Sequence, residues 1–200
     1  QKKLKKSLPK FKAISVREEA GKRIIEEATG LKNIEVVLDP TFLLPKENWE
    51  KLEKNPFENK KEKYVLAYFL GEENMGYIKK YCQERNFELI NFYDEKKNYG
   101  PAQFLYLINH AKLVLTDSFH GSVFSIIFNK SFLVFDRVEK SINNNMNSRL
   151  ETLLKIFELD NQKFNNEILD EQYKIDYTKI NKILLEAQEK SKNFLRKALN

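Results

Sequence analysis

The sequence predicts an α/β fold built on a Rossmann-like, doubly wound parallel sheet. Three observations predict it: apolar and amphipathic segments alternate between residues 64 and 135, the turns between them are short, and the run Tyr64–Leu70 is apolar throughout, as in a strand buried on both faces. The chain of 200 residues is long enough to bury one sizeable core. We therefore expect a single domain over residues 1–200, with one sheet of about five or six strands.

The first third of the chain predicts two short strands and two helices. Glu18 and Glu19 favour a helix N-terminus because they complement the helix dipole, and Gly30 suits the C-terminal cap of that helix. Asp39 and Pro40 stop the second strand. The expected elements are a strand over 11–16, a helix over 18–28, a strand over 35–38, a short helix over 46–54 and a polar linker over 55–63.

A repeating strand–helix pattern occupies the middle of the chain. Its apolar runs are short, and its amphipathic segments have the spacing of helices. Because such units place parallel strands side by side, we expect all four strands of this segment to be central in the sheet. The pattern predicts strands over 64–70, 87–92, 113–115 and 132–135, and helices over 74–85, 101–111 and 119–129.

The last part of the chain predicts helices outside the sheet. After a polar, Asn-rich loop over 142–147, Ser148 followed by Glu151 indicates a capping box at the start of a helix. Residues 160–200 form a C-terminal helical extension, in which 177–199 is one long amphipathic helix. Its apolar stripe is longer than the core of a small domain needs, so we expect it to cover a surface that this chain does not fully close.

Composition and charge narrow the classes of partner. The formal net charge is +6, but the lysines mostly interleave with glutamates, which is typical of a solvated face, and we expect no nucleic-acid partner. A basic N-terminal extension over residues 1–10 keeps a peripheral membrane contact open. One cysteine can form neither an internal disulfide nor a Cys-rich zinc site, and no segment has the apolar length of a membrane span. A reducing, cytoplasmic setting fits best, and the first residue, Gln1, predicts a piece of a longer or processed protein.

The strongest candidate for chemistry is the segment Thr116–Ser122, between a strand and a buried helix. In an open parallel sheet, ligands bind beyond the carboxyl ends of the strands, and a helix N-terminus there favours phosphate or carboxylate. His120 can donate or accept a proton near neutral pH, and Gly121 allows a ligand to approach the backbone. Ser118 and Ser122 add hydroxyl groups. The alternative is structural: Asp117 or Ser118 merely caps the helix, and His120 is a polar side chain with its hydrogen bonds satisfied.

Further candidates follow other strands or begin a helix. Arg17 follows the first strand and can hold a carboxylate or phosphate through two parallel bonds, unless it simply pairs with Glu18. Arg149 lies in the first turn of a helix, where a cation opposes the dipole, so it indicates either a bound anion or an acidic neighbour. Gly71, with Asn74, ends another strand, where it either lines a cleft or forms an ordinary turn.

Several common kinds of site are missing from the sequence. It contains no glycine-rich dinucleotide motif, no P-loop and no nucleophile elbow of a hydrolase. Its two histidines and one cysteine are far apart and lack the spacing of metal ligands, so we expect no metal site.

Two longer strings carry a resemblance to a known family. The strings Gly100–Ile108 and Thr116–Ser125 closely resemble the polysaccharide pyruvyl transferases, and Ile14–Glu18, Val37–Thr41 and Met146–Arg149 occur in the order which that family shows. The resemblance covers residues 15–159 and implies one half of a GT-B-like two-domain fold. It also implies that the active site lies in the cleft between the halves, and that the N-terminal partner domain is absent from this chain.

The resemblance implies a reaction and its participants. A pyruvyl group would pass from phosphoenolpyruvate to two hydroxyls of a saccharide or lipid-linked saccharide, as a ketal, during synthesis of a bacterial cell-surface polysaccharide. In this scheme His120 protonates the donor, Arg17 and the helix N-terminus at Gly121 and Ser122 hold the phosphate, and Arg149 holds the carboxylate. The scheme requires no cofactor and places the enzyme in the cytoplasm, where it can act at the inner face of the membrane.

Two other functions remain open from the sequence. In the first, the chain is the nucleotide-sugar-binding half of a GT-B glycosyltransferase, and the base lies near Phe92 and Tyr93. In the second, it is a noncatalytic domain whose basic N-terminal patch binds a membrane surface or nucleic acid, with a steep dependence on salt.

Overall fold

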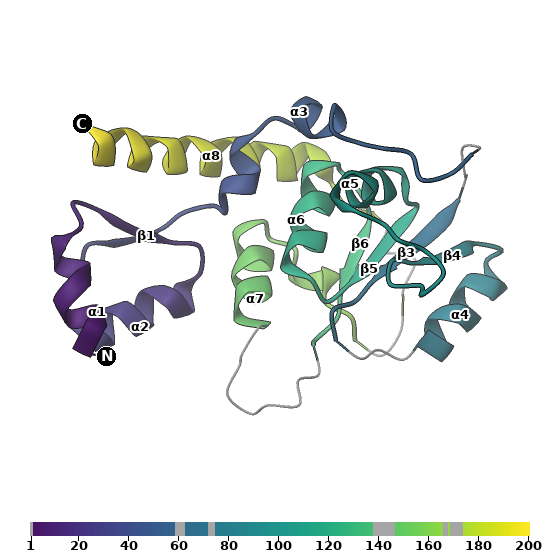
Figure 1. Ribbon diagram of the computed structural model, residues 1–200, viewed down its shortest axis with the longest axis horizontal. Helices are drawn as coiled ribbons and strands as arrows, with labels where there is room; N and C mark the ends of the chain where they lie inside the picture. Colours follow the sequence, from purple (N-terminus) through teal and green to yellow (C-terminus); the bar gives the residue numbers. More distant parts are fainter. Residues whose placement is uncertain (1, 59–62, 72–74, 138–146, 166–167, 169–173) are drawn as a thin grey trace.

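The computed structural model describes residues 2–58, 63–71, 75–137, 147–165, 168 and 174–200. Within these ranges all strands pair in parallel, and they form two separate sheets. The larger sheet has the order β4–β3–β5–β6, and the smaller one consists of β1 and β2 (Figure 1). The strands are β1 (Ile14–Val16), β2 (Ile34–Val36), β3 (Tyr64–Tyr68), β4 (Glu88–Asn91), β5 (Leu113–Thr116) and β6 (Phe132–Val134).

The α/β class and the parallel pairing are confirmed, but the expectation of one sheet is wrong for the described residues. β3 and β5 are central, whereas β4 and β6 are edge strands. The outer side of β6 is occupied by residues 163 and 164. Val134 forms a bridge with Lys163, and the Phe164 N–H donates a hydrogen bond to the Val134 carbonyl. β4 has only one buried residue, Ile90, as is typical of an edge. Among the described residues, β1 and β2 pair with each other and with no strand of the larger sheet.

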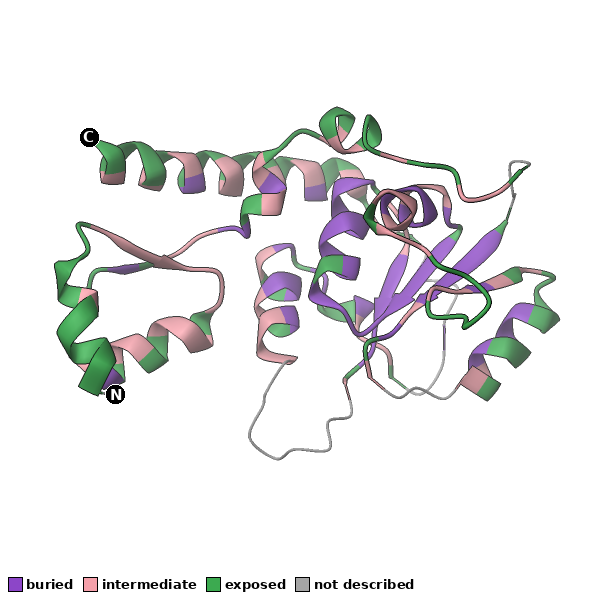
Figure 2. Cartoon of the chain, viewed as in Figure 1, coloured by how far each residue is buried: buried purple, intermediate pink, exposed green. Residues whose placement is uncertain are grey.

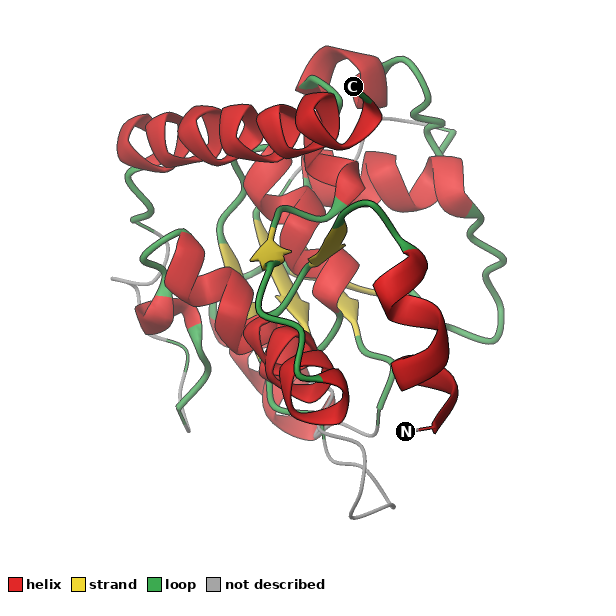
Figure 3. Cartoon of the chain, turned by 90° about the vertical axis from the view of Figure 1, so that its left-hand side faces the viewer, coloured by secondary structure: helices red, strands yellow, loops and turns green. Residues whose placement is uncertain are grey.

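Helices lie on both faces of the larger sheet, as a doubly wound fold requires (Figure 3). The described helices are α1 (Lys2–Ser7), α2 (Glu19–Thr29), α3 (Lys46–Glu50), α4 (Met75–Glu84), α5 (Pro101–His110), α6 (Phe119–Ile127), α7 (Asn147–Ile156) and α8 (Tyr177–Leu199), with short 3-10 turns η1 (Leu8–Lys10), η2 (Pro40–Leu43) and η3 (Asp160–Gln162).

The core divides into two layers because side chains along a strand alternate between faces. On β3, Tyr64 and Leu66 pack with α5, α6 and α7, whereas Val65 and Ala67 pack with Ile78 and neighbouring residues of α4. Strands β3 and β5 are buried on both faces, and this explains their continuous apolar runs. Burial is concentrated around this sheet (Figure 2).

The smaller sheet belongs to a β1–α2–β2 unit that lies apart from the larger sheet (Figure 1). Its strands are only partly buried, and Ile24 on α2 remains exposed. The expected basic extension over residues 1–10 forms α1 and η1, which contain no buried residue.

Two contacts, made by α7 and α8, join the β1–α2–β2 unit to the rest of the described chain. Ser148 lies inside α7 rather than at its cap, and its hydroxyl donates to the Glu18 carboxylate at 2.8 Å, so the predicted capping box is wrong. α8 contacts the segment that follows β2, because the Leu38 N–H donates to the Ser191 hydroxyl at 3.0 Å. Leu195 and Leu199 stay exposed at the end of α8, in agreement with the expectation of a surface that the described part of the chain does not close.

Residues 142–146 of the expected Asn-rich loop lie outside the described residues. Among the described residues, no helix combines the length and the apolar character that crossing a membrane requires.

Candidate functional site

The candidate site lies where β5 ends and α6 begins. Ser118 caps α6: its hydroxyl accepts from the Gly121 N–H at 3.4 Å, and its own N–H donates to the Thr116 hydroxyl at 3.0 Å. The Ser122 hydroxyl donates to the Ser118 carbonyl at 3.3 Å, and both serines are buried. Both hydroxyls form hydrogen bonds within the turn. For these two serines the contacts are those of a helix cap, as the structural alternative expects.

Gly121 is required by packing within this turn. A Cβ at this position would lie 2.5 Å from the Thr116 Oγ1, closer than real side chains approach. That oxygen cannot easily move, since it also donates to the Tyr68 carbonyl at 2.6 Å. The glycine therefore allows α6 to lie close against β5 at the residue that follows His120.

Asp117 secures the neighbouring strand end. Its carboxylate accepts from the Leu70 N–H at 2.7 Å and the Gly71 N–H at 2.8 Å, and it pairs with the Arg137 guanidinium at 3.0 Å. A Cβ on Gly71 would lie 2.9 Å from the Arg137 Cγ. Gly71 thus forms a tight turn beside the site, and Asn74, predicted with it, lies outside the described residues.

His120 lies in the first turn of α6 and presents an exposed side chain, 49% accessible. Its Nε2 lies 3.9 Å from the Asp39 Oδ1. Partial burial lowers the pKa of His120, and the positive charges of Arg17 and Arg149 lower it further, while the Asp39 carboxylate opposes them. A nearby anion would reverse this balance, because it would favour the imidazolium.

Arg17 and Asp39 come from the carboxyl ends of β1 and β2 and meet His120 from the other side of the site. The Arg17 Nη1 lies 2.7 Å from the Asp39 Oδ2, and the other carboxylate oxygen accepts from the Thr41 N–H and hydroxyl. Burial opposes ionisation of Asp39, but the Thr41 bonds, Arg17 and His120 outweigh it and hold its pKa below the usual value. Arg17 and His120 therefore share one site although their strands belong to different sheets.

Two arginines gather over one aromatic ring. The guanidinium carbon of Arg17 lies 5.1 Å from the centre of the Phe119 ring, and that of Arg149 lies 6.0 Å from it. Burial lowers the pKa of Arg149, and so does the charge of Arg17, whereas the Glu18 carboxylate raises it. The two guanidinium groups, an adjacent imidazole and the N-terminus of α6 make this region suited to an anion.

The structure brings together most of the predicted site residues. His120, Arg17 and Arg149 form one cluster, and Ser118, Gly121 and Ser122 support it from behind. Among the described residues no group of His, Cys, Asp or Glu side chains could hold a metal ion.

The sequence reasoning missed Asp39, Phe119, Asp117 and Arg137 as members of this site. Asp39 and Arg137 each follow a strand, as Arg17 does, and this position was the signal that could have found them. Asp117 and Phe119 lay inside the string that the sequence singled out, but their roles depend on contacts with Gly71 and with the two arginines.

Aromatic residues border the cluster at the ends of β3 and β4. The rings of Tyr68 and Tyr93 stack with centres 5.7 Å apart, and Tyr93 is 53% exposed. The Tyr68 hydroxyl lies beside the hydroxyls of Tyr93 and Ser118, and burial raises its pKa to about 12. Phe92 packs against Tyr68 at 4.9 Å between ring centres, so the residues predicted near a nucleotide base do lie close to the site.

Comparison with protein families gives one match. The family model described as polysaccharide pyruvyl transferase matches residues 1–137, about two thirds of the chain, and includes the Arg17, Asp39 and His120 positions. No match was found among curated proteins or among solved structures.

Proposed function

This chain belongs to the polysaccharide pyruvyl transferase family, and from that premise we propose that it moves a pyruvyl group from phosphoenolpyruvate onto two hydroxyls of a saccharide as a cyclic ketal. One observation supports the donor more than any other: Arg17 and Arg149 flank the Phe119 ring beside an exposed His120. Two guanidinium groups suit a donor that carries both a phosphate and a carboxylate.

Binding of the donor would use the cations of this cluster. Arg17 and the N-terminus of α6 would hold the phosphate, and Arg149 the carboxylate. Asp39 keeps Arg17 in place through the 2.7 Å ion pair, and Ser148 ties the start of α7 to Glu18, the residue after Arg17. The two arginines are thus carried by segments that are fastened to each other.

The chemical steps need one proton donor. His120 protonates the methylene carbon of phosphoenolpyruvate, and the cation that forms at the adjacent carbon is attacked by a saccharide hydroxyl, which returns a proton to His120. The bond from that carbon to the phosphate oxygen then breaks, and inorganic phosphate leaves into the arginine cluster. A second hydroxyl attacks the same carbon, closes the ketal and gives its proton to the departing phosphate, so one donor and one diol give one ketal and one phosphate.

Asp39 would act as a positioning residue for both partners. Its carboxylate lies 3.9 Å from the His120 Nε2 and 2.7 Å from Arg17, so it favours the protonated imidazole and orients the guanidinium. The negative charges of the bound donor add to this effect and raise the pKa of His120, which prepares the imidazolium for proton transfer.

The test of the proposed function is a change at His120 in the enzyme that contains this chain. We expect His120→Gln to abolish release of phosphate from phosphoenolpyruvate in the presence of saccharide, and to leave the melting temperature nearly unchanged because the side chain is exposed. His110→Gln is the matched control, since His110 contacts Glu53 away from the site. Retained transfer per folded molecule in His120→Gln would contradict the mechanism.

We also propose a setting for this activity. The chain would be one half of a GT-B-like enzyme, with the partner domain beside β1 and β2, which have no other partner strand among the described residues. Donor and acceptor, the latter a saccharide or lipid-linked saccharide for a bacterial surface polysaccharide, would meet in the cytoplasm, and no cofactor enters the scheme. Exposed lysines on α1 support a contact with the inner face of the membrane.

A nucleotide-sugar-binding role is the second candidate, and the exposed Tyr93 stacked on Tyr68 favours it. A nucleoside diphosphate that raises the melting temperature, where phosphoenolpyruvate does not, would support this role over pyruvyl transfer. The third, noncatalytic reading predicts binding to vesicles or nucleic acid with a steep salt dependence and no effect of His120→Gln.

A further inference from the structure

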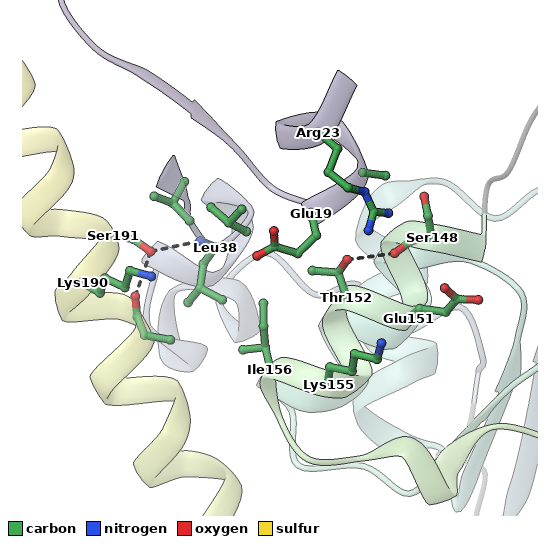
Figure 4. A pocket seen from close by; sticks show the side chains of 14 residues that line it. Glu19, Arg23, Leu38, Ser148, Glu151, Thr152, Lys155, Ile156, Lys190 and Ser191 are labelled. Atoms are coloured by element: carbon green, nitrogen blue, oxygen red, sulfur yellow. Dashed lines mark hydrogen bonds between the residues drawn. The ribbon is translucent and has the colours of Figure 1, made fainter. Parts of the chain in front are cut away.

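A second site adjoins the cationic cluster. A cavity of about 490 Å³ lies between the β1–α2–β2 unit on one side and helices α7 and α8 on the other (Figure 4). Its volume falls within the range of small-molecule sites. None of the cluster residues Arg17, Asp39, His120 or Arg149 lines it.

Charged side chains surround this cavity without pairing with one another. Five charged residues line the cavity. Within the described residues, none of their side chains has an ion-pair or hydrogen-bond partner, and all five are exposed. Two carboxylates and three cations make the rim nearly balanced in charge, so it offers both acceptors and donors of hydrogen bonds. The five are Glu19 and Arg23 of α2, Glu151 and Lys155 of α7, and Lys190 of α8.

The walls between these charges are largely apolar. Leu38, just after β2, and Ile156 of α7 face the space, and Glu19 reaches between Leu38 and Thr152 (Figure 4). The polar groups of the walls are already used: Ser191 bonds the Leu38 N–H and the Ala187 carbonyl, and Thr152 donates to the Ser148 carbonyl at 2.9 Å. A ligand would therefore rest an apolar face on the walls and make its hydrogen bonds at the rim.

This chemistry matches a saccharide. A sugar ring is neutral, carries hydroxyls around its edge and has apolar C–H faces, which suits a rim whose two carboxylates and three cations nearly balance in charge. We propose that the cavity is the binding site of the acceptor saccharide, an inference that rests on the proposed transferase function and adds the place where its acceptor is held.

The position of the cavity agrees with transfer between neighbouring sites. Ser148 lines the cavity, and its hydroxyl bonds Glu18, the residue next to Arg17. Leu38 lines the cavity and directly precedes Asp39, which contacts His120. The same two segments thus border both the acceptor cavity and the donor cluster.

The experiment is titration of the isotope-labelled chain by NMR with methyl glycosides of glucose, galactose, mannose and N-acetylglucosamine, each at millimolar concentration. We expect at least one glycoside to shift the amide signals of Glu19, Thr152 and Lys190. Glu151→Gln should weaken that binding about tenfold, since a hydrogen bond to a charged acceptor is replaced by one to a neutral amide. Glu186→Gln is the matched control, because Glu186 is an exposed glutamate of α8 that does not line the cavity.

The titrations distinguish failure of the acceptor site from failure of the proposed function. Shifts elsewhere in the chain, no shifts with any glycoside, or equal affinity in Glu151→Gln and wild type would overturn the acceptor site. Phosphoenolpyruvate is titrated separately and should shift His120 and Arg17. A chain that binds glycosides in the cavity but shows no response of His120 to phosphoenolpyruvate supports the saccharide site and contradicts the donor assignment.

Discussion

At the scale of single residues, the site depends on a histidine whose charge is controlled by its surroundings. Burial and two arginines lower the pKa of His120, and the Asp39 carboxylate opposes them. The free site therefore holds fewer protons near neutral pH than an ordinary histidine would. Anion binding and protonation then favour each other, as linkage requires.

We expect the NMR midpoint of His120 in the free chain to lie below its usual value of 6.5, and to rise when phosphoenolpyruvate is added. Consequently, affinity for phosphoenolpyruvate should increase as pH falls toward the midpoint of the free chain. The ring signals of His110, which lies beside Glu53, serve as the internal reference. A His120 midpoint that the ligand leaves unmoved would contradict the placement of the donor.

The Asp39 carboxylate should stabilise the fold as well as the site. Asp39→Asn removes the ion pair with Arg17, and we expect it to lower the free energy of unfolding by about 2 kcal/mol at pH 7. Because the pKa of Asp39 is lowered from 3.8, this contribution is present above pH 3.8 and is lost as pH falls through the lower, folded value. Urea unfolding of both proteins at pH 7 and at acid pH measures it, and an equal difference at both pH values would refute the assignment.

Gly121 and Gly21 give a matched pair for the packing argument. Gly121→Ala places a Cβ 2.5 Å from the Thr116 Oγ1, and we expect a loss of about 2 kcal/mol of stability. Gly21→Ala, inside α2, meets no atom closer than 3.5 Å and should stabilise by up to about 1 kcal/mol, because alanine is the better helix former. Chemical denaturation of the two variants compares them, and equal effects would show that the turn before α6 can relax.

At the scale of elements, α8 connects the two parts of the described chain. It packs on the larger core through Ile180 and contacts the segment after β2 through the Ser191 hydroxyl, which accepts from the buried Leu38 N–H at 3.0 Å. A long helix with few buried residues thus holds the smaller sheet in place.

We expect Ser191→Ala to destabilise the β1–α2–β2 unit by about 1.5 kcal/mol, because the Leu38 N–H loses its partner. Ser7→Ala is the control, since Ser7 is exposed and makes no cap bond. Hydrogen exchange at Leu38 and its neighbours should quicken in Ser191→Ala alone. Unchanged exchange there would mean that α8 does not hold the smaller sheet.

At the scale of the whole molecule, the donor cluster joins parts that are far apart in the chain. Arg17 and Asp39 come from the smaller sheet, His120 from the end of β5 and Arg149 from α7. A ligand that binds all of them should therefore stabilise the molecule as a unit, by about 2.7 kcal/mol at a concentration one hundred times its Kd.

The sequence by itself determined the fold class, the parallel pairing and the segment that carries His120. These depend on local patterns: alternating strand and helix periods, and a polar turn where an apolar strand meets a buried helix. The resemblance of the same segment to pyruvyl transferases agrees with the family match.

Only the tertiary structure decided that the strands form two sheets, and that Asp39 lies between Arg17 and His120. The physical reason is that strand pairing and side-chain contacts join residues that are far apart in the chain, so local patterns do not specify the partners. The segment near Lys163 takes the outer side of β6, and β1 and β2 pair with each other in a separate sheet. Their carboxyl ends then meet α6 across the site, and residues 39 and 120, which no local pattern relates, become neighbours.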